Sequence, residues 1–111
     1  MLAIMNSVLD MRKADCFAHP FMAGYIHAFD DPHEVKGITD NDIGDILTKA
    51  NSLGTAWELN VGAVAGDPEF HHRYFQIGKE VGVTFNIGTD AHLLRNIDTH
   101  QFTDMLKKIL Y

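Results

Sequence analysis

The feature that most constrains the fold is an alternation of three short apolar runs with segments of helix length. The runs cover residues 15–18, 55–61 and 83–87, and turn-forming residues follow each of them. The intervening segments carry apolar residues at spacings of three and four, which is the period of a helix with one buried face. Strands separated by such helices are typical of β-α units with a parallel sheet. We therefore expect an α/β fold.

Start and stop signals delimit the helical segments. Residues 6–13 are expected to form the last turns of a helix, and Thr39 or Asp40 to cap a second helix that ends at Gly54. Proline in the first turn and acids near the positive end predict a third helix from Asp67 to Gly82. Thr99 is expected to cap the last one. The expected inward positions of the last three helices are Ile43, Ile46, Leu47 and Ala50; Phe70, Tyr74, Ile77 and Val81; Phe102, Leu106, Ile109 and Leu110.

The loops that follow the strands carry the polar residues. His19 follows the first apolar run, which we expect to be a buried strand, Asn60 closes the second, and Asp90 and His92 follow the third. In β-α folds these loops share one face, and active sites collect there. The segment 21–40 is expected to be a long loop, and 62–66 a flexible loop of small residues.

Asp90 and His92 form an Asp-X-His triplet, and carboxylate and imidazole are both good ligands for Zn, Mn or Fe. In an extended segment, residues two apart point to the same side. His19, beside a stiffening proline, is the third candidate ligand. Each pattern also has a plain interpretation, because an isolated triplet is a weak motif and a histidine before proline is often a turn residue.

Three segments together resemble the latter half of a PHP domain, the polymerase and histidinol phosphatase superfamily. They read Cys-Phe-Ala-His-Pro at 16–20, Trp-Glu-Leu-Asn at 57–60 and Gly-Val-Thr-Phe-Asn-Ile-Gly-Thr-Asp-Ala-His at 82–92. The family's later motifs are a strand ending in His-Pro, a Glu-hydrophobic-Asn strand and a Gly-Ser/Thr-Asp-Ala-His strand exit. All three occur here in the family's order and span nearly the whole chain.

The resemblance implies part of a distorted β/α barrel with up to three divalent metal ions at the carboxyl ends of its strands. Members hydrolyse phosphate esters, and the domain also occurs in bacterial replicative polymerases. By the resemblance, His19 falls on one metal of a bridged pair, Asp90 on the other, and His92 on the third. The catalytic residues are not assigned.

The family's early motifs are missing from this sequence, including a His-X-His on the first strand and a bridging glutamate. One ligand per metal is too few, because such ions usually take three or more protein ligands. Residues 1–111 are therefore expected to be a single partial domain, the carboxyl-terminal half of a barrel whose class runs to roughly 250 residues.

Several other polar residues have two interpretations each. Asn60 is a candidate for substrate binding or a cap of the following turn, and Arg95 is a phosphate clamp or an ordinary surface arginine. Glu58 is a buried partner for a basic group or a solvent-facing strand residue. Cys16 is expected to be a buried structural thiol. Of the remaining histidines, His71, His72 and His100 are expected on the surface, and His27 and His33 in a solvated loop near Asp30, Asp31 and Glu34.

The amino-acid composition limits the classes of partner that the chain is expected to bind. Nine Lys and Arg against fifteen Asp and Glu give a net charge of −6. Because this charge repels the phosphate backbone, we do not expect the chain to bind nucleic acids. No apolar run suits a membrane span, and a single cysteine fits a cytoplasmic setting.

Two functions remain in competition: a histidinol-phosphatase-like phosphoesterase acting on a phosphorylated small molecule, or a catalytically silent module. The module would self-associate or pair with a missing amino-terminal half, because a partial barrel exposes sheet edges.

Overall fold

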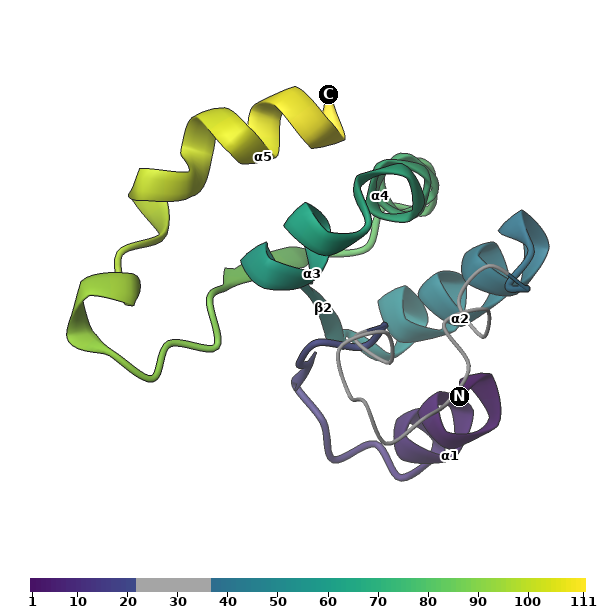
Figure 1. Ribbon diagram of the computed structural model, residues 1–111. Helices are drawn as coiled ribbons and strands as arrows, with labels where there is room; N and C mark the ends of the chain where they lie inside the picture. The colour runs from purple at the N-terminus through teal and green to yellow at the C-terminus, as the bar shows by residue number, and fades with distance from the viewer. Residues whose placement is uncertain (22–36) are drawn as a thin grey trace.

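The structure is a computed structural model that describes residues 1–21 and 37–111. Strands and helices alternate through most of it, as the sequence predicts, and two 3-10 turns precede the last helix (Figure 1). The elements are α1 (Leu2–Asp10), β1 (Cys16–Phe17), α2 (Asp40–Leu53), β2 (Ala56–Asn60), α3 (Val61–Gly66), α4 (Pro68–Val81), β3 (Phe85–Gly88), η2 (Leu94–Asn96), η3 (Thr99–Phe102) and α5 (Thr103–Leu110). The predicted loop at 21–40, with His27, His33, Asp30, Asp31 and Glu34, lies largely outside the described residues. None of the described helices is long and apolar enough to cross a membrane.

The three strands form one parallel sheet in the order β1-β2-β3. Phe17 pairs with Trp57 in the first ladder, and Glu58 pairs with Asn86 in the second. The predicted α/β class with parallel strands is confirmed. The described residues form an open three-stranded sheet and do not close a barrel, so the barrel architecture stays a prediction.

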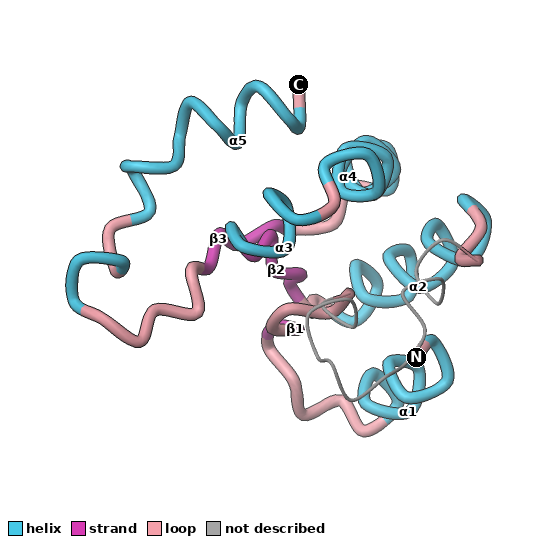
Figure 2. Tube along the Cα trace, viewed as in Figure 1, coloured by secondary structure: helices cyan, strands magenta, loops and turns pink. Residues whose placement is uncertain are grey.

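Helices cover one face of this sheet (Figure 2). Trp57 and Leu59 point to that face and are 0% and 3% exposed. Phe17 stacks on Trp57 with ring centroids 4.6 Å apart, and Tyr74 of α4 meets Phe85 of β3 edge-on at 5.4 Å. Because side chains alternate along a strand, the opposite face carries Cys16, Glu58 and Asn86, of which Cys16 and Asn86 are exposed and Glu58 is half-buried.

Helix α2 begins and ends where the sequence predicts. Thr39 and Asp42 form a capping box, in which the Thr39 hydroxyl accepts the Asp42 N–H at 3.2 Å and the Asp42 carboxylate accepts the Thr39 N–H at 3.0 Å. The hydrogen bonds from the side chain and backbone of Thr39 hold the pKa of Asp42 below its usual range. Gly54 ends the helix at φ 71°, a conformation that favours glycine.

Two boundaries differ from the prediction. Residues 62–66 belong to helix α3 instead of a flexible loop, because Asn60 caps that turn and the apolar side chains of Val61 and Val64 are buried. These interactions outweigh the poor helix propensity of glycine. The last helix is preceded by η3, and Asp98 caps η3 through the N–H of His100, so the cap is not Thr99.

The prediction that His71 lies on the surface is wrong. Its side chain is 5% exposed and packs edge-on against the rings of Phe70 and Tyr74, while Nδ1 lies 2.9 Å from the Asp67 carbonyl oxygen. Burial lowers the pKa of His71 below its ordinary 6.5, although the Asp67 hydrogen bond partly opposes the shift. The neighbouring His72 is exposed, as expected.

We predict that the free energy of unfolding falls as the pH drops below about 6.5, because the unfolded chain then protonates His71 before the folded protein does. The loss continues down to the lowered pKa of the folded state, with a slope of at most about 1.4 kcal/mol per pH unit from this group. His71→Gln should flatten the slope, whereas His72→Gln on the exposed neighbouring position should retain it. Urea unfolding between pH 5 and 7.5 measures both; equal slopes in the two variants would contradict the prediction.

Close packing of α4 on β3 depends on Gly78. A Cβ at this position would lie 2.5 Å from Cε2 of the Phe85 ring and 3.2 Å from Val83 Cγ1. Gly44 of α2 is a matched glycine with room to spare, since a Cβ there would meet Ile77 Cγ2 at 3.9 Å. Gly44 and Gly78 both lie inside helices, but a side chain could be accommodated at Gly44 and not at Gly78.

We predict that Gly78→Ala lowers the free energy of unfolding by about 1–3 kcal/mol, because the added methyl group displaces the Phe85 ring. Gly44→Ala should leave the stability unchanged or raise it by up to about 1 kcal/mol, through better helix propensity. Chemical denaturation of both variants tests this. A stabilised Gly78→Ala variant would show that the contact between α4 and β3 is looser than described.

Candidate functional site

Three strand exits meet at the carboxyl edge of the sheet. His19 follows β1, Asn60 is the last residue of β2, and Asp90 follows β3. The strands are parallel and in adjacent positions, so their carboxyl ends lie at the same edge. The fold thus places three of the sequence-predicted site residues on one side of the molecule.

His19 and Asp90 approach each other from the two outer strands. Their side chains are 42% and 44% exposed, and His19 Nε2 lies 3.9 Å from Asp90 Oδ1. At this distance the two groups form an ion pair when the imidazole is protonated. Residues far apart in the chain thereby supply a nitrogen and an oxygen donor to one solvent-accessible place.

Both residues have left-handed backbones, with φ 32° at His19 and φ 50° at Asp90. Histidine and aspartate adopt this region more often than most residues, but it still costs about 1–3 kcal/mol relative to ordinary conformations. Such conformations occur often in active sites and ligand clamps. The turn of the backbone at each strand exit is therefore part of how the pair is presented.

His92 contacts Asp90 through the backbone. Its Nδ1 lies 2.7 Å from the Asp90 carbonyl oxygen, and the residue is exposed. A neutral imidazole that donates from Nδ1 keeps Nε2 as an acceptor or metal ligand. Arg95 is also exposed, in η2, and no described contact joins its guanidinium to His19, Asp90 or His92.

Asn60 has the capping role that the sequence left open. It is 3% exposed, and its Oδ1 accepts the N–H of Ala63 at 3.1 Å, at the start of α3. Its Nδ2 is buried and has no hydrogen-bond partner among the described residues. A role in substrate binding stays a prediction.

Cys16 and Glu58 lie on the face of the sheet that the helices leave uncovered. The prediction of a buried thiol is wrong: Cys16 is exposed, and Asn86 Nδ2 lies 3.5 Å from its Sγ. Glu58 is half-buried and partners no basic side chain among the described residues; its Oε2 accepts the backbone N–H of His19. Sequence reasoning did not place Glu58 in the site, although its position between buried neighbours on β2 fixes the face it occupies.

The described residues do not by themselves fit a resident metal ion. Donor atoms on one tetrahedral ion with bonds of about 2.1 Å lie roughly 3.4 Å apart, whereas His19 Nε2 and Asp90 Oδ1 lie 3.9 Å apart. The resemblance assigns the two residues to different ions of a bridged pair, so each of those ions has a single ligand here. No group of three or more His, Cys, Asp and Glu side chains that could hold an ion occurs in residues 1–21 and 37–111. The pair is at most part of a ligand set.

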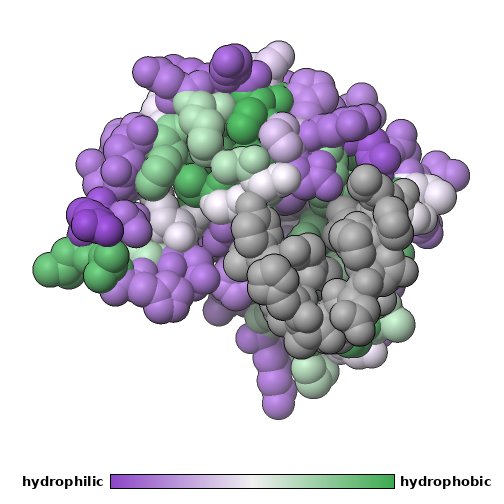
Figure 3. Space-filling view, viewed as in Figure 1, coloured by the Kyte–Doolittle hydropathy of each residue, from purple (hydrophilic) through white to green (hydrophobic). Residues whose placement is uncertain are grey.

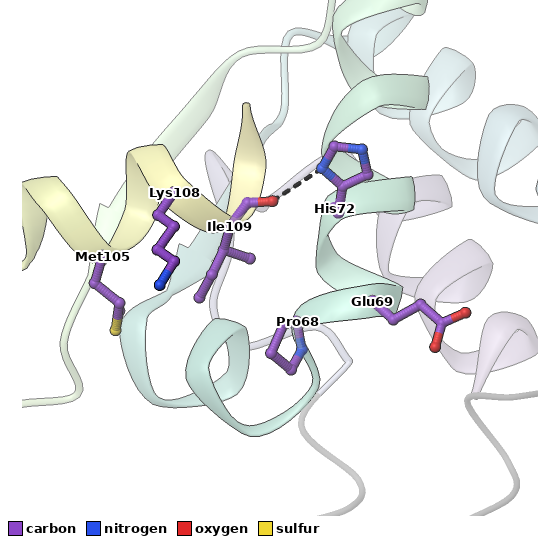
Figure 4. A pocket seen from close by; sticks show the side chains of 6 residues that line it. All are labelled: Pro68, Glu69, His72, Met105, Lys108 and Ile109. Carbon is purple, nitrogen blue, oxygen red and sulfur yellow. Dashed lines mark hydrogen bonds between the residues drawn. The ribbon is translucent and has the colours of Figure 1, made fainter.

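A hollow of about 510 Å³ lies elsewhere, between α4 and α5 (Figure 4). Pro68, Met105 and Ile109 form its apolar lining, and the Lys108 side chain extends toward it, whereas Glu69 points away. His72 is tied at its rim, with Nδ1 2.9 Å from the Ile109 carbonyl oxygen. None of the predicted site residues lines this hollow.

We predict that Asn60→Ala lowers the free energy of unfolding by about 1 kcal/mol, because the first turn of α3 loses its cap. Asn60→Ser should retain most of the stability, since serine supplies an equivalent acceptor and removes the unpartnered amide nitrogen. Thermal and urea unfolding of the two variants provide the test. Similar losses in both would indicate that side-chain volume, not capping, is the role of Asn60.

Comparison of the chain with models of protein families, with curated proteins and with solved structures gave no match. The inference about function therefore depends on the order of the motifs and on the geometry of the strand exits.

Proposed function

We propose that the chain is the carboxyl-terminal part of a PHP-type, histidinol-phosphatase-like phosphoesterase that acts when its metal site is complete. The observation that carries the proposal is the approach of His19 and Asp90 to 3.9 Å at the carboxyl edge of a parallel sheet. The two residues belong to the first and third PHP-like motifs, and the three motifs lie on adjacent strands in chain order. If the three short motifs occurred together by chance, nothing would require their polar residues to lie close to one another in the fold.

In this proposal His19, Asp90 and His92 supply part of the ligand set for divalent Zn, Mn or Fe. The incomplete fit of the described residues means that further ligands come from another segment or another chain. Asn60 and Arg95 are the proposed contacts for a phosphorylated small molecule: an amide at the central strand exit, and a guanidinium whose planar fork suits phosphate oxygens.

A second candidate function is a catalytically silent module that dimerises or pairs with a missing amino-terminal half. An exposed apolar segment after β3 favours it, because Leu93, Leu94 and Ile97 are 52%, 87% and 60% exposed. Figure 3 shows apolar atoms protruding at the left, where Figure 1 places η2. Exposed apolar residues beside an unpaired sheet edge are typical of interaction surfaces.

Because one chain supplies only part of a ligand set, we expect it to retain Zn²⁺, Mn²⁺ or Fe²⁺ in equilibrium dialysis only at chain concentrations where a second copy completes the site. Asp90→Ala should weaken that retention at least tenfold through loss of a ligand. The metal-loaded chain should hydrolyse p-nitrophenyl phosphate, and the rate per chain should rise with chain concentration if a second copy completes the site. Asp90→Ala should abolish this turnover.

A matched control is the exposed pair formed by His100 and Asp98, whose Nδ1 and Oδ1 lie 3.1 Å apart in η3 and its cap. Asp98→Ala removes a carboxylate beside a histidine, as Asp90→Ala does, but away from the strand exits, and should change neither metal retention nor turnover. Metal-loaded chain that shows no turnover at any concentration would rule out phosphoesterase activity of this chain and favour the silent module.

A further inference from the structure

The side chain of Glu58 spans the space between the exits of the two outer strands. Glu58 lies on the middle strand and pairs in register with Asn86 of β3. One of its carboxylate oxygens, Oε2, accepts the backbone N–H of His19, just beyond β1. The other, Oε1, occupies the place that a side chain on Gly88, the last residue of β3, would take.

Gly88 makes room for this carboxylate. A Cβ at Gly88 would lie 2.6 Å from Glu58 Cδ and 3.1 Å from Glu58 Cγ, closer than atoms approach without one of them moving. Among the described glycines, those with positive φ are Gly54 and Gly82, so the backbone of Gly88 does not demand glycine. The missing side chain at Gly88 is therefore used for space, and Glu58 fills that space.

We propose that Glu58 is the positioning residue of the His19–Asp90 pair, fixing the exit of β1 against the exit of β3. The proposal rests on the proposed function for its chemical purpose, because the pair matters as part of a ligand set. Its structural content stands on the contacts of Glu58 alone.

The hydrogen bond acts at the point where the chain turns. The N–H that Glu58 accepts belongs to His19 itself, which has φ 32° and whose Nε2 lies 3.9 Å from Asp90 Oδ1. A carboxylate that accepts a backbone N–H makes a stronger bond than a neutral acceptor does. On the other side, Gly88 precedes Asp90 in the same short exit, so a carboxylate seated on Gly88 fixes where that exit begins. Loss of the carboxylate frees both turns and separates the donor atoms of the pair.

Four variants separate this role from a general effect on folding. Glu58→Ala removes the acceptor, and Gly88→Ala leaves Glu58 in place but displaces its carboxylate. Glu58→Gln retains an oxygen acceptor and serves as the rescue variant. Asn86→Ala is the matched control, since it truncates a polar side chain on the same uncovered face, which contacts Cys16 and not His19.

The first measurement needs no metal. In NMR spectra we expect the His19 amide to exchange with solvent at least tenfold faster in Glu58→Ala and Gly88→Ala, and the proton contacts between the His19 ring and the Asp90 side chain to disappear. Glu58→Gln and Asn86→Ala should keep both signals. The two damaging substitutions should also be non-additive: Gly88→Ala should have no further effect when Glu58 is already alanine.

The second measurement is metal affinity, which we expect to fall about 10- to 100-fold in Glu58→Ala and Gly88→Ala, the usual effect of removing a group that orients a ligand. Unchanged His19 exchange in Glu58→Ala, or additive effects of the two substitutions, would overturn the proposal. If the wild-type chain binds no metal at any chain concentration while the NMR results appear as expected, a metal site formed by this chain alone or by its copies is excluded, and the positioning role of Glu58 stands.

Discussion

The parallel pairing of β2 with a strand on each side determines where the residues at the strand exits, His19, Asn60 and Asp90, lie. Parallel strands end at the same edge, so the pairing brings residues from distant parts of the chain to one place. The pairing in turn depends on the buried face of β2, where Trp57 and Leu59 pack beneath the helices and fix the register. A shift of β2 by one residue would exchange its two faces, bury Glu58 and expose Trp57. The geometry of the site is therefore a consequence of apolar packing on the far side of the sheet.

The sequence predicts the helices and strands well where local signals agree with tertiary packing. The Thr39 cap and the left-handed Gly54 delimit α2 as expected, because both act through the backbone of their own turn. The sequence misjudges α3, where burial and the Asn60 cap overcome glycine. It also misjudges His71, although His71 shares a spacing of three and four with Tyr74 and Phe75, both of them buried. Tertiary packing decides the case of α3, which local helix propensity does not predict, whereas the spacing of His71 to Tyr74 and Phe75 is a sequence signal for its burial.

The candidate site is only partly predictable for a different reason. Motif order identifies His19 and Asp90, and the alternation of strands and helices places them at one edge. The role of Glu58 depends on which residue of β1 and which residue of β3 lie beside it. This register cannot be predicted from the sequence of any one strand alone. Cys16 is similar, because an apolar run predicts burial only when something covers the strand, and helices cover just one face of this sheet. The parts of the site that depend on contacts between strands therefore cannot be predicted from single motifs.

The left-handed backbones of His19 and Asp90 also set stability and function against each other. Glycine would occupy φ values of 32° and 50° without steric cost, so at these positions it would relieve the backbone while removing the donor atoms. A chain that keeps an imidazole and a carboxylate at these two turns keeps them against the preference of its own backbone. The proposed ligand pair is therefore carried by two turns whose backbone conformation glycine would adopt at lower cost.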